Sequence, residues 1–262
     1  MTWRLHIVFS QKILSCIAVI SLLVSFGIGS IRVCNAAEPH VKTDHQLRVS
    51  NSGKTNACRY TVFLPPSYGS SSRKWPLILF LHGAGERGED LRRVSRHGPP
   101  KLVASGEMDL PFIVVAPQCP KGSWWNDRDQ IDNLSRLVSE LETNYRIDKR
   151  RIYLTGLSMG GYGTWSLAAS DPSRFAAIAP ICGGGNLRDA GIIKDIPIWV
   201  FHGARDNVVP VSESKQMVQA IRAAGGKPEF TIYPKAGHDS WTASYENPDL
   251  YQWFLKHQLP ET

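Results

Sequence analysis

The chain has 262 residues, of which 42% are hydrophobic and 20% charged, and its formal net charge is +7. This composition is typical of one globular domain. The densest basic runs, residues 91–96 and 149–151, are short and lack the aromatic residues that interleave with basic ones in nucleic-acid-binding surfaces. We therefore expect no nucleic-acid partner.

The first 36 residues have the pattern of a secretory signal peptide. Arg4 and Lys12 precede the uncharged stretch 13–31, and small residues suited to cleavage follow near Ala36. Cleavage would remove residues 1–36, lower the net charge to +4 and export the protein to the periplasm or the cell exterior, with no stable membrane insertion. An uncleaved membrane anchor is the alternative, because this stretch almost spans a bilayer. The serines and glycines that dilute it favour cleavage.

The remainder of the chain predicts alternating strands and helices. Residues 37–57 are polar without clear periodicity, so they form either a leader or an edge strand, and the catalytic domain covers residues 58–262. Continuous apolar runs of a few residues are typical of strands buried on both faces. The predicted strands are 60–64, 77–81, 112–116, 152–155, 175–181, 196–201 and 229–233, and the predicted helices are 131–145, 162–169, 212–224 and 250–257.

Strands separated by helix-length segments imply βαβ crossovers. We therefore predict an α/β fold with a single, mostly parallel sheet flanked by helices. In such sheets functional groups gather beyond the carboxyl ends of the strands. The short segment between Ile181 and Ile196 leaves no room for a large cap domain and favours an open site.

Ser158 is the predicted nucleophile. The segment Gly156-Leu157-Ser158-Met159-Gly160 lies between the strand predicted at 152–155 and the helix predicted at 162–169. A serine on such a turn projects beyond the end of the sheet, and the start of the following helix offers free N–H groups. The Met159 N–H is therefore a candidate oxyanion donor. A plain helix N-cap is the alternative role for the serine.

Two further strand ends carry groups that would activate this serine. A serine hydroxyl is a weak nucleophile and needs a base. His238 follows the strand predicted at 229–233 and would accept the proton, and Asp206 follows the strand predicted at 196–201. An ionised Asp206 would fix the histidine tautomer. Asp239 is an alternative acid, but adjacent side chains in a loop rarely face each other.

The loop after the strand predicted at 77–81 is rich in small residues, His82-Gly83-Ala84-Gly85. Small side chains let backbone N–H groups approach a developing oxyanion. Gly83 or Ala84 would donate the first hydrogen bond of an oxyanion hole, and Met159 would donate the second. His82 is expected to hold this loop in place.

Four side chains are candidates for substrate binding. The tryptophans lie in loops that face the predicted site, where they could line an acyl or aromatic pocket or simply pack. Glu86, which is beside Arg87, could brace its own loop or touch substrate. The four are Glu86, Trp124, Trp125 and Trp241.

After signal cleavage Cys58, Cys119 and Cys182 would remain. An odd count with wide spacing does not form a disulfide framework, and no C-x-x-C motif or His/Cys cluster indicates a metal site. Cys119 and Cys182 follow strands that this fold separates by roughly 14 Å. A bridge needs Cα atoms within about 7 Å, so we expect thiols unless the loops converge.

From about Arg59 to Trp241 the chain resembles the secreted esterase and predicted-peptidase branch of the α/β-hydrolases. That branch is related to dienelactone hydrolases, polyhydroxybutyrate-depolymerase-like proteins and phospholipase/carboxylesterase proteins. The resemblance implies a triad of Ser158, Asp206 and His238 on an α/β-hydrolase fold, with no metal and no organic cofactor. The segments that carry it are 81–88, 116–120, 156–163, 202–206 and 237–241.

The expected function is therefore an exported serine hydrolase that cleaves carboxylic esters through an acyl-enzyme intermediate. Export and an open site suit small-molecule or polysaccharide-linked esters, with the acyl length and the oligomeric state left open. A serine peptidase acting on short peptides is the alternative. A non-catalytic binding protein on the same fold is a third hypothesis, against which the complete set of catalytic residues argues.

Overall fold

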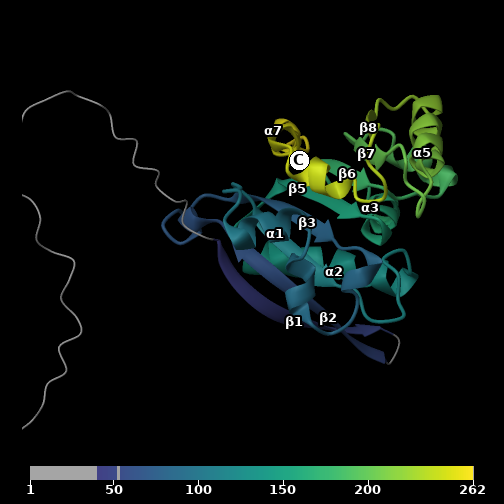
Figure 1. The fold of residues 1–262 in the computed structure, drawn as a ribbon. Helices are drawn as coiled ribbons and strands as arrows, with labels where there is room; N and C mark the ends of the chain where they lie inside the picture. Colours follow the sequence, from purple (N-terminus) through teal and green to yellow (C-terminus); the bar gives the residue numbers. More distant parts are fainter. Residues whose placement is uncertain (1–39, 52–53, 262) are drawn as a thin grey trace, which may run out of the picture. The chain divides into compact units, whose positions relative to one another are not determined.

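The computed structural model describes residues 40–51 and 54–261, so the predicted signal peptide, residues 1–36, lies outside the described residues. Within the described part of the chain, no helix combines the length and the apolar character that crossing a bilayer requires. One eight-stranded sheet has the order β1-β2-β4-β3-β5-β6-β7-β8 (Figure 1). The strands are β1 (Val41–Asn51), β2 (Lys54–Leu64), β3 (Trp75–Leu81), β4 (Ile113–Gln118), β5 (Ile147–Leu157), β6 (Ala177–Ile181), β7 (Trp199–Gly203) and β8 (Glu229–Tyr233).

The sheet is mostly parallel. β1 pairs antiparallel with β2, and β2 pairs antiparallel with β4. All later neighbours, from β4–β3 to β7–β8, are parallel. Parallel neighbours need crossover connections, and helices supply most of them. The α/β-hydrolase fold that the sequence predicts is confirmed.

Helices cover both faces of the sheet. α2, α3 and α5 contribute to one cluster of buried apolar side chains, and α1, α6 and α7 contribute to the other. The helices are α1 (Gly98–Ser105), α2 (Arg128–Asn144), α3 (Met159–Ser170), α4 (Ala190–Ile193), α5 (Val211–Ala223), α6 (Trp241–Tyr245) and α7 (Pro248–Lys256).

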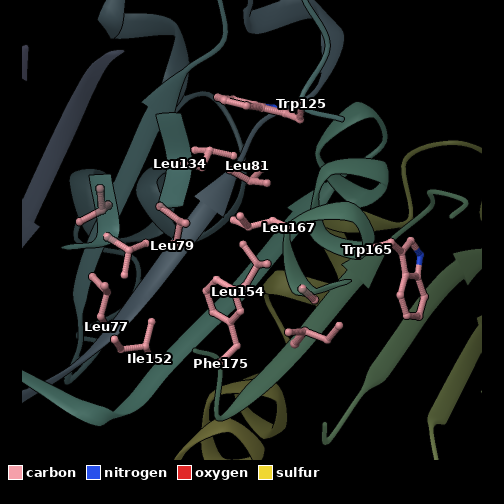
Figure 2. Close-up of a cluster of buried hydrophobic side chains, with 14 of the residues drawn as sticks. Leu77, Leu79, Leu81, Trp125, Leu134, Ile152, Leu154, Trp165, Leu167 and Phe175 are labelled. Atoms are coloured by element: carbon pink, nitrogen blue, oxygen red, sulfur yellow. The ribbon is translucent and has the colours of Figure 1, made fainter. Parts of the chain in front are cut away.

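Strand β3 shows how the two clusters arise from one apolar run. Successive side chains of a strand point to opposite faces. Leu77, Leu79 and Leu81 enter the cluster with α2 and α3, and Figure 2 shows Leu81 close to Leu134 and Leu167. Ile78 and Phe80 enter the other cluster. A strand buried on both faces needs an unbroken apolar sequence, which explains the run at 77–81.

Several boundaries differ from the sequence prediction. Val41–Asn51 forms the edge strand, but residues 54–57, expected in the same leader-or-edge segment, belong to β2. The predicted strand at 152–155 extends to Ile147–Leu157. Helix Gly98–Ser105 was not predicted, because it contains Pro99 and Pro100 and proline usually indicates the end of a helix. Both prolines lie in the first turn, where proline is compatible with a helix.

Candidate active site

Ser158 occupies a sharp turn between β5 and α3. Its backbone angles are φ 53° and ψ −114°, a positive-φ conformation that non-glycine residues rarely adopt. The flanking glycines make the turn feasible. A Cβ atom on Gly160 would overlap the carbonyl oxygen of Leu81, and a Cβ atom on Gly156 would overlap the carbonyl oxygen of Gly160. The turn therefore packs directly against the end of β3.

The structure brings together the three side chains predicted as a triad. His238 Nε2 lies 2.9 Å from Ser158 Oγ, and His238 Nδ1 lies 2.7 Å from Asp206 Oδ2. The three residues follow β5, β7 and β8, whose carboxyl ends share one edge of the sheet. This is the arrangement in which an imidazole can accept the serine proton while a carboxylate holds its other nitrogen.

Asp206 is held as an ionised acceptor. Its side chain is fully buried, and Oδ1 accepts hydrogen bonds from the N–H groups of Val208 and Val209, each at 2.9 Å. Burial by itself raises the pKa of Asp206. The hydrogen bonds from His238 and from these two N–H groups outweigh it and hold the pKa below its ordinary value.

Asp239 has a different role from Asp206. It is exposed, its Oδ1 accepts the N–H of Thr242 at 3.0 Å, and its Oδ2 accepts the Thr242 hydroxyl at 3.0 Å. These bonds satisfy the start of α6. In this structure the acid beside His238 Nδ1 is therefore Asp206.

The predicted oxyanion donors lie at two helix starts. Met159 is the first residue of α3, and Ala84 is the first residue of a 3-10 turn, Ala84–Glu86, preceded by Gly83. The first N–H groups of a helix have no acceptor within it. Gly83 packs on the side chain of Leu157, because a Cβ atom there would lie 2.8 Å from Leu157 Cδ1. The loop after β3 thus touches the residue before Ser158, and its role as an oxyanion hole stays a prediction.

His82 fixes this loop. Its Nδ1–H donates to the carbonyl of Gly83 at 2.6 Å, and its Nε2 accepts the N–H of Cys119 at 3.0 Å. Burial lowers the pKa of His82 to about 4, so the ring is neutral, as this pair of bonds requires. The Trp125 indole N–H donates to the His82 carbonyl at 2.9 Å.

Glu86 and Arg87 do not pair with each other. Arg87 Nε donates to the carbonyl of Ala84 at 3.1 Å, and its Nη1 donates to the carbonyl of Ser123 at 3.2 Å. Arg87 therefore braces its own loop. Glu86 is buried, which raises its pKa, and its Oε1 lies 3.8 Å from His97 Nε2. Substrate contact by Glu86 stays a prediction.

The three candidate tryptophans have three different environments. Trp125 is 1% exposed and packs in the core, whereas Trp124 is 46% exposed. Trp241 meets His238 edge to face, with ring centroids 5.3 Å apart, and meets His97 in the same way at 5.6 Å. His97 therefore lies on the same indole as the triad histidine. Its position depends on α1, which the sequence did not reveal.

One group of metal-capable side chains lies in the described residues: Cys182, Asp206 and His238 have ligand atoms within 4.8 Å of one another. Burial raises the pKa of the Cys182 thiol to about 12, and both nitrogens of His238 are already hydrogen-bonded. The donor set therefore fits a hydrogen-bonded triad better than a metal centre. Cys58 and Cys119 are, like Cys182, buried free thiols.

Comparison with known proteins identifies the chain. The profile of the dienelactone hydrolase family matches residues 116–249, a segment that contains Ser158, Asp206 and His238. The chain belongs to the dienelactone hydrolase family. This agrees with the resemblance expected from the sequence.

Curated relatives of this dienelactone hydrolase family member are esterases or related hydrolases. A bifunctional acetylxylan esterase/xylanase of Neocallimastix patriciarum is 28% identical over 198 residues, which cover 73% of this chain and 27% of that protein. A putative carboxymethylenebutenolidase of Escherichia coli is 36% identical over 107 residues, covering 37% of this chain and 39% of that protein. Feruloyl esterase D of Neurospora crassa is 27% identical over 223 residues, which cover 79% of this chain and 73% of that protein. The chain thus spans less than half the length of the first two relatives.

Two solved structures of similar fold are those of an esterase and a peptidase. A thermostable esterase is 36% identical with a TM-score of 0.71, and the match covers 82% of this chain and 63% of that one. An acylaminoacyl peptidase of Pyrococcus horikoshii has a TM-score of 0.65 at 16% identity, covering 88% of this chain and 44% of that one. The second likeness shows the fold alone.

Proposed function

We propose that this member of the dienelactone hydrolase family is a serine hydrolase that cleaves carboxylic esters. The observation that carries the proposal is the continuous hydrogen-bonded series from Ser158 Oγ through His238 to the buried carboxylate of Asp206, at 2.9 and 2.7 Å. The positive-φ turn at Ser158 and the N–H groups at the starts of α3 and of the 3-10 turn Ala84–Glu86 support it.

In the first half of the reaction Ser158 Oγ attacks the ester carbonyl carbon while His238 Nε2 takes the hydroxyl proton. The carbonyl oxygen becomes an oxyanion, which the N–H groups of Met159 and of Gly83 or Ala84 stabilise. Asp206 stabilises the imidazolium. The intermediate collapses to an acyl-enzyme as His238 gives its proton to the leaving alkoxide, which departs as an alcohol.

In the second half, water replaces the alcohol. His238 takes a proton from the water, whose oxygen attacks the acyl carbon and forms a second oxyanion. Collapse of this intermediate breaks the bond to Ser158 Oγ, and His238 returns its proton to that oxygen. The carboxylic acid leaves and the enzyme is restored.

The substrate class we propose is a small-molecule or polysaccharide-linked ester. Two relatives carry acetylxylan esterase and feruloyl esterase in their names, and both align with more than two thirds of this chain. Only η4 (Leu187–Asp189) and the short α4 separate β6 from β7, which favours an open site that a polymer could reach.

A fluorophosphonate probe and p-nitrophenyl acetate test the chemistry together. Stoichiometric labelling and turnover that both disappear in Ser158→Ala would support the proposal. Labelling without ester turnover would favour a peptidase, and turnover retained in Ser158→Ala would exclude the proposed nucleophile. Chelators should leave the rate unchanged, and a loss restored by zinc would contradict a metal-free mechanism.

We also propose export with removal of residues 1–36, on the charge and apolar pattern of that segment. Thiol titration of denatured protein from the expressing cell reports cleavage directly. The mature chain holds Cys58, Cys119 and Cys182, whereas the uncut chain adds Cys16 and Cys34. Three reactive thiols and an N-terminus at residue 37 are expected. Five thiols would indicate a retained anchor.

A further inference from the structure

A groove lies directly beside the predicted oxyanion loop. It has a volume of about 660 Å³, and its lining includes Ala84, Gly85 and Arg87 together with Lys121 and Gly122. Because Ala84, a predicted oxyanion donor, belongs to its lining, the groove adjoins the predicted oxyanion loop. The volume is ample for more than one hexose ring.

An exposed indole stands at the side of this groove. The Arg87 guanidinium carbon lies 5.2 Å from the centre of the Trp124 ring, so Arg87 belongs to both the groove and the aromatic contact. Trp124 is 46% exposed, yet its backbone is fixed, since its N–H donates to Asp127 Oδ2 at 2.8 Å and the next residue, Trp125, is buried. An exposed indole on a fixed backbone is typical of a binding surface.

The groove walls are held before any ligand binds. The buried Gln118 side chain donates from Nε2 to the carbonyls of Glu86 and Asp90, each at 2.8 Å. The N–H of Gly88 donates to the carbonyl of Cys119 at 3.0 Å, joining the loop after β3 to the segment that carries Lys121. A preformed site loses less conformational entropy on binding.

The charges of the groove favour a neutral ligand. Arg87, Arg93 and Lys121 are offset in large part by Glu89 and Asp90. Such a mixture supplies many hydrogen-bond donors and acceptors without selecting an anion or a cation. The exposed indole favours a pyranose, which stacks its C–H face on the ring and keeps its hydroxyl groups in water, over an aromatic acyl group, which gains most when both faces are covered.

We propose that this groove and Trp124 bind the neutral sugar residues that carry the scissile ester, so that the enzyme prefers esters on oligosaccharides to esters of small alcohols. The proposal rests on the proposed esterase function and specifies its substrate. Trp124 is the stacking platform, and Arg87 couples it to the oxyanion loop.

Binding and selectivity are measured separately. In the Ser158→Ala background, isothermal titration calorimetry should detect xylohexaose binding, and Trp124→Ala should weaken binding about tenfold, the range expected for one aromatic contact. In the active enzyme, the ratio of kcat/KM for acetylated xylo-oligosaccharide to that for p-nitrophenyl acetate should fall about tenfold in Trp124→Ala and recover in large part in Trp124→Phe. Ile192→Ala, which removes an equally exposed apolar side chain in α4, should leave both quantities unchanged.

The outcomes separate the two proposals. A ratio that stays constant in Trp124→Ala, whether the two rates fall together or not at all, overturns the sugar site while leaving the esterase intact. Absence of xylohexaose binding in the Ser158→Ala protein also overturns it. Turnover of p-nitrophenyl acetate that survives Ser158→Ala would overturn the esterase proposal itself.

Discussion

The carboxylate of Asp206 lies between two histidines, and His202 is the one that the proposed reaction does not use. His202 Nε2 is 3.2 Å from Asp206 Oδ2, the same oxygen that lies 2.7 Å from His238 Nδ1. His202 is fully buried, and its Nε2 is also 2.8 Å from the carbonyl of Val209. A carbonyl oxygen only accepts, so Nε2 carries a proton. His202 therefore donates to the Val209 carbonyl, and the same ring nitrogen lies against Asp206 Oδ2 and helps to position that carboxylate.

Replacing His202 should lower kcat more than it changes KM. In His202→Phe the polar contact with Asp206 Oδ2 is lost, so we expect kcat for p-nitrophenyl acetate to fall by about ten- to a hundredfold with KM changed less than about threefold. His202→Gln, which keeps an N–H donor, should recover part of the rate. A purely structural role would instead give equal losses in both variants, in step with their thermal stability.

Asp206 and Asp239 form a matched pair for testing the acid. Asp206→Asn should reduce kcat by roughly 10³- to 10⁴-fold, because the amide favours the wrong tautomer of His238. Asp239→Asn should change kcat by less than about threefold and cost at most about 1 kcal/mol of stability, since it only caps α6. A larger rate loss in Asp239→Asn than in Asp206→Asn would reverse the assignment.

Gly160→Ala should prevent normal folding of the turn. The added methyl group would overlap the carbonyl oxygen of Leu81, so we expect a loss of more than about 3 kcal/mol in the free energy of unfolding. Gly191→Ala is the control, because it lies in α4 with open space around it and should be neutral or slightly stabilising. Urea unfolding of both variants measures the difference. Equal stability would mean that the turn is not as close to β3 as the structure has it.

The pKa of His82, lowered to about 4 by burial, makes stability depend on pH. In the unfolded chain an ordinary histidine binds a proton below about pH 6.5. The folded ring does not until about pH 4. The unfolded state therefore binds more protons in this window, so the His82 contribution is intact above about pH 6.5 and declines by roughly 3 kcal/mol as the pH falls toward 4. Urea titrations at pH 7 and 4.5 should show a smaller decline in His82→Gln than in the wild type, and parallel declines would contradict it.

The sequence alone determined the main architecture and the three triad candidates. Apolar runs such as 77–81 indicate strands buried on both faces, because only an unbroken apolar run places apolar side chains on both faces of the sheet. Ser158, Asp206 and His238 could be grouped because each follows a strand, and the carboxyl ends of parallel strands meet at one edge. The glycines beside Ser158 predicted the tight turn that the structure shows.

Only the tertiary structure decided which neighbour each side chain meets. Trp124 and Trp125 are adjacent in sequence, yet one is exposed at a groove and the other is buried against His82, because burial depends on elements far away along the chain. The sequence already favoured Asp206 over Asp239, and the structure adds the contacts that place Asp206 against His238 and Asp239 at the start of α6. His202 had no signal of its own, since its contact with Asp206 exists only after the loop beyond β7 has closed around both residues.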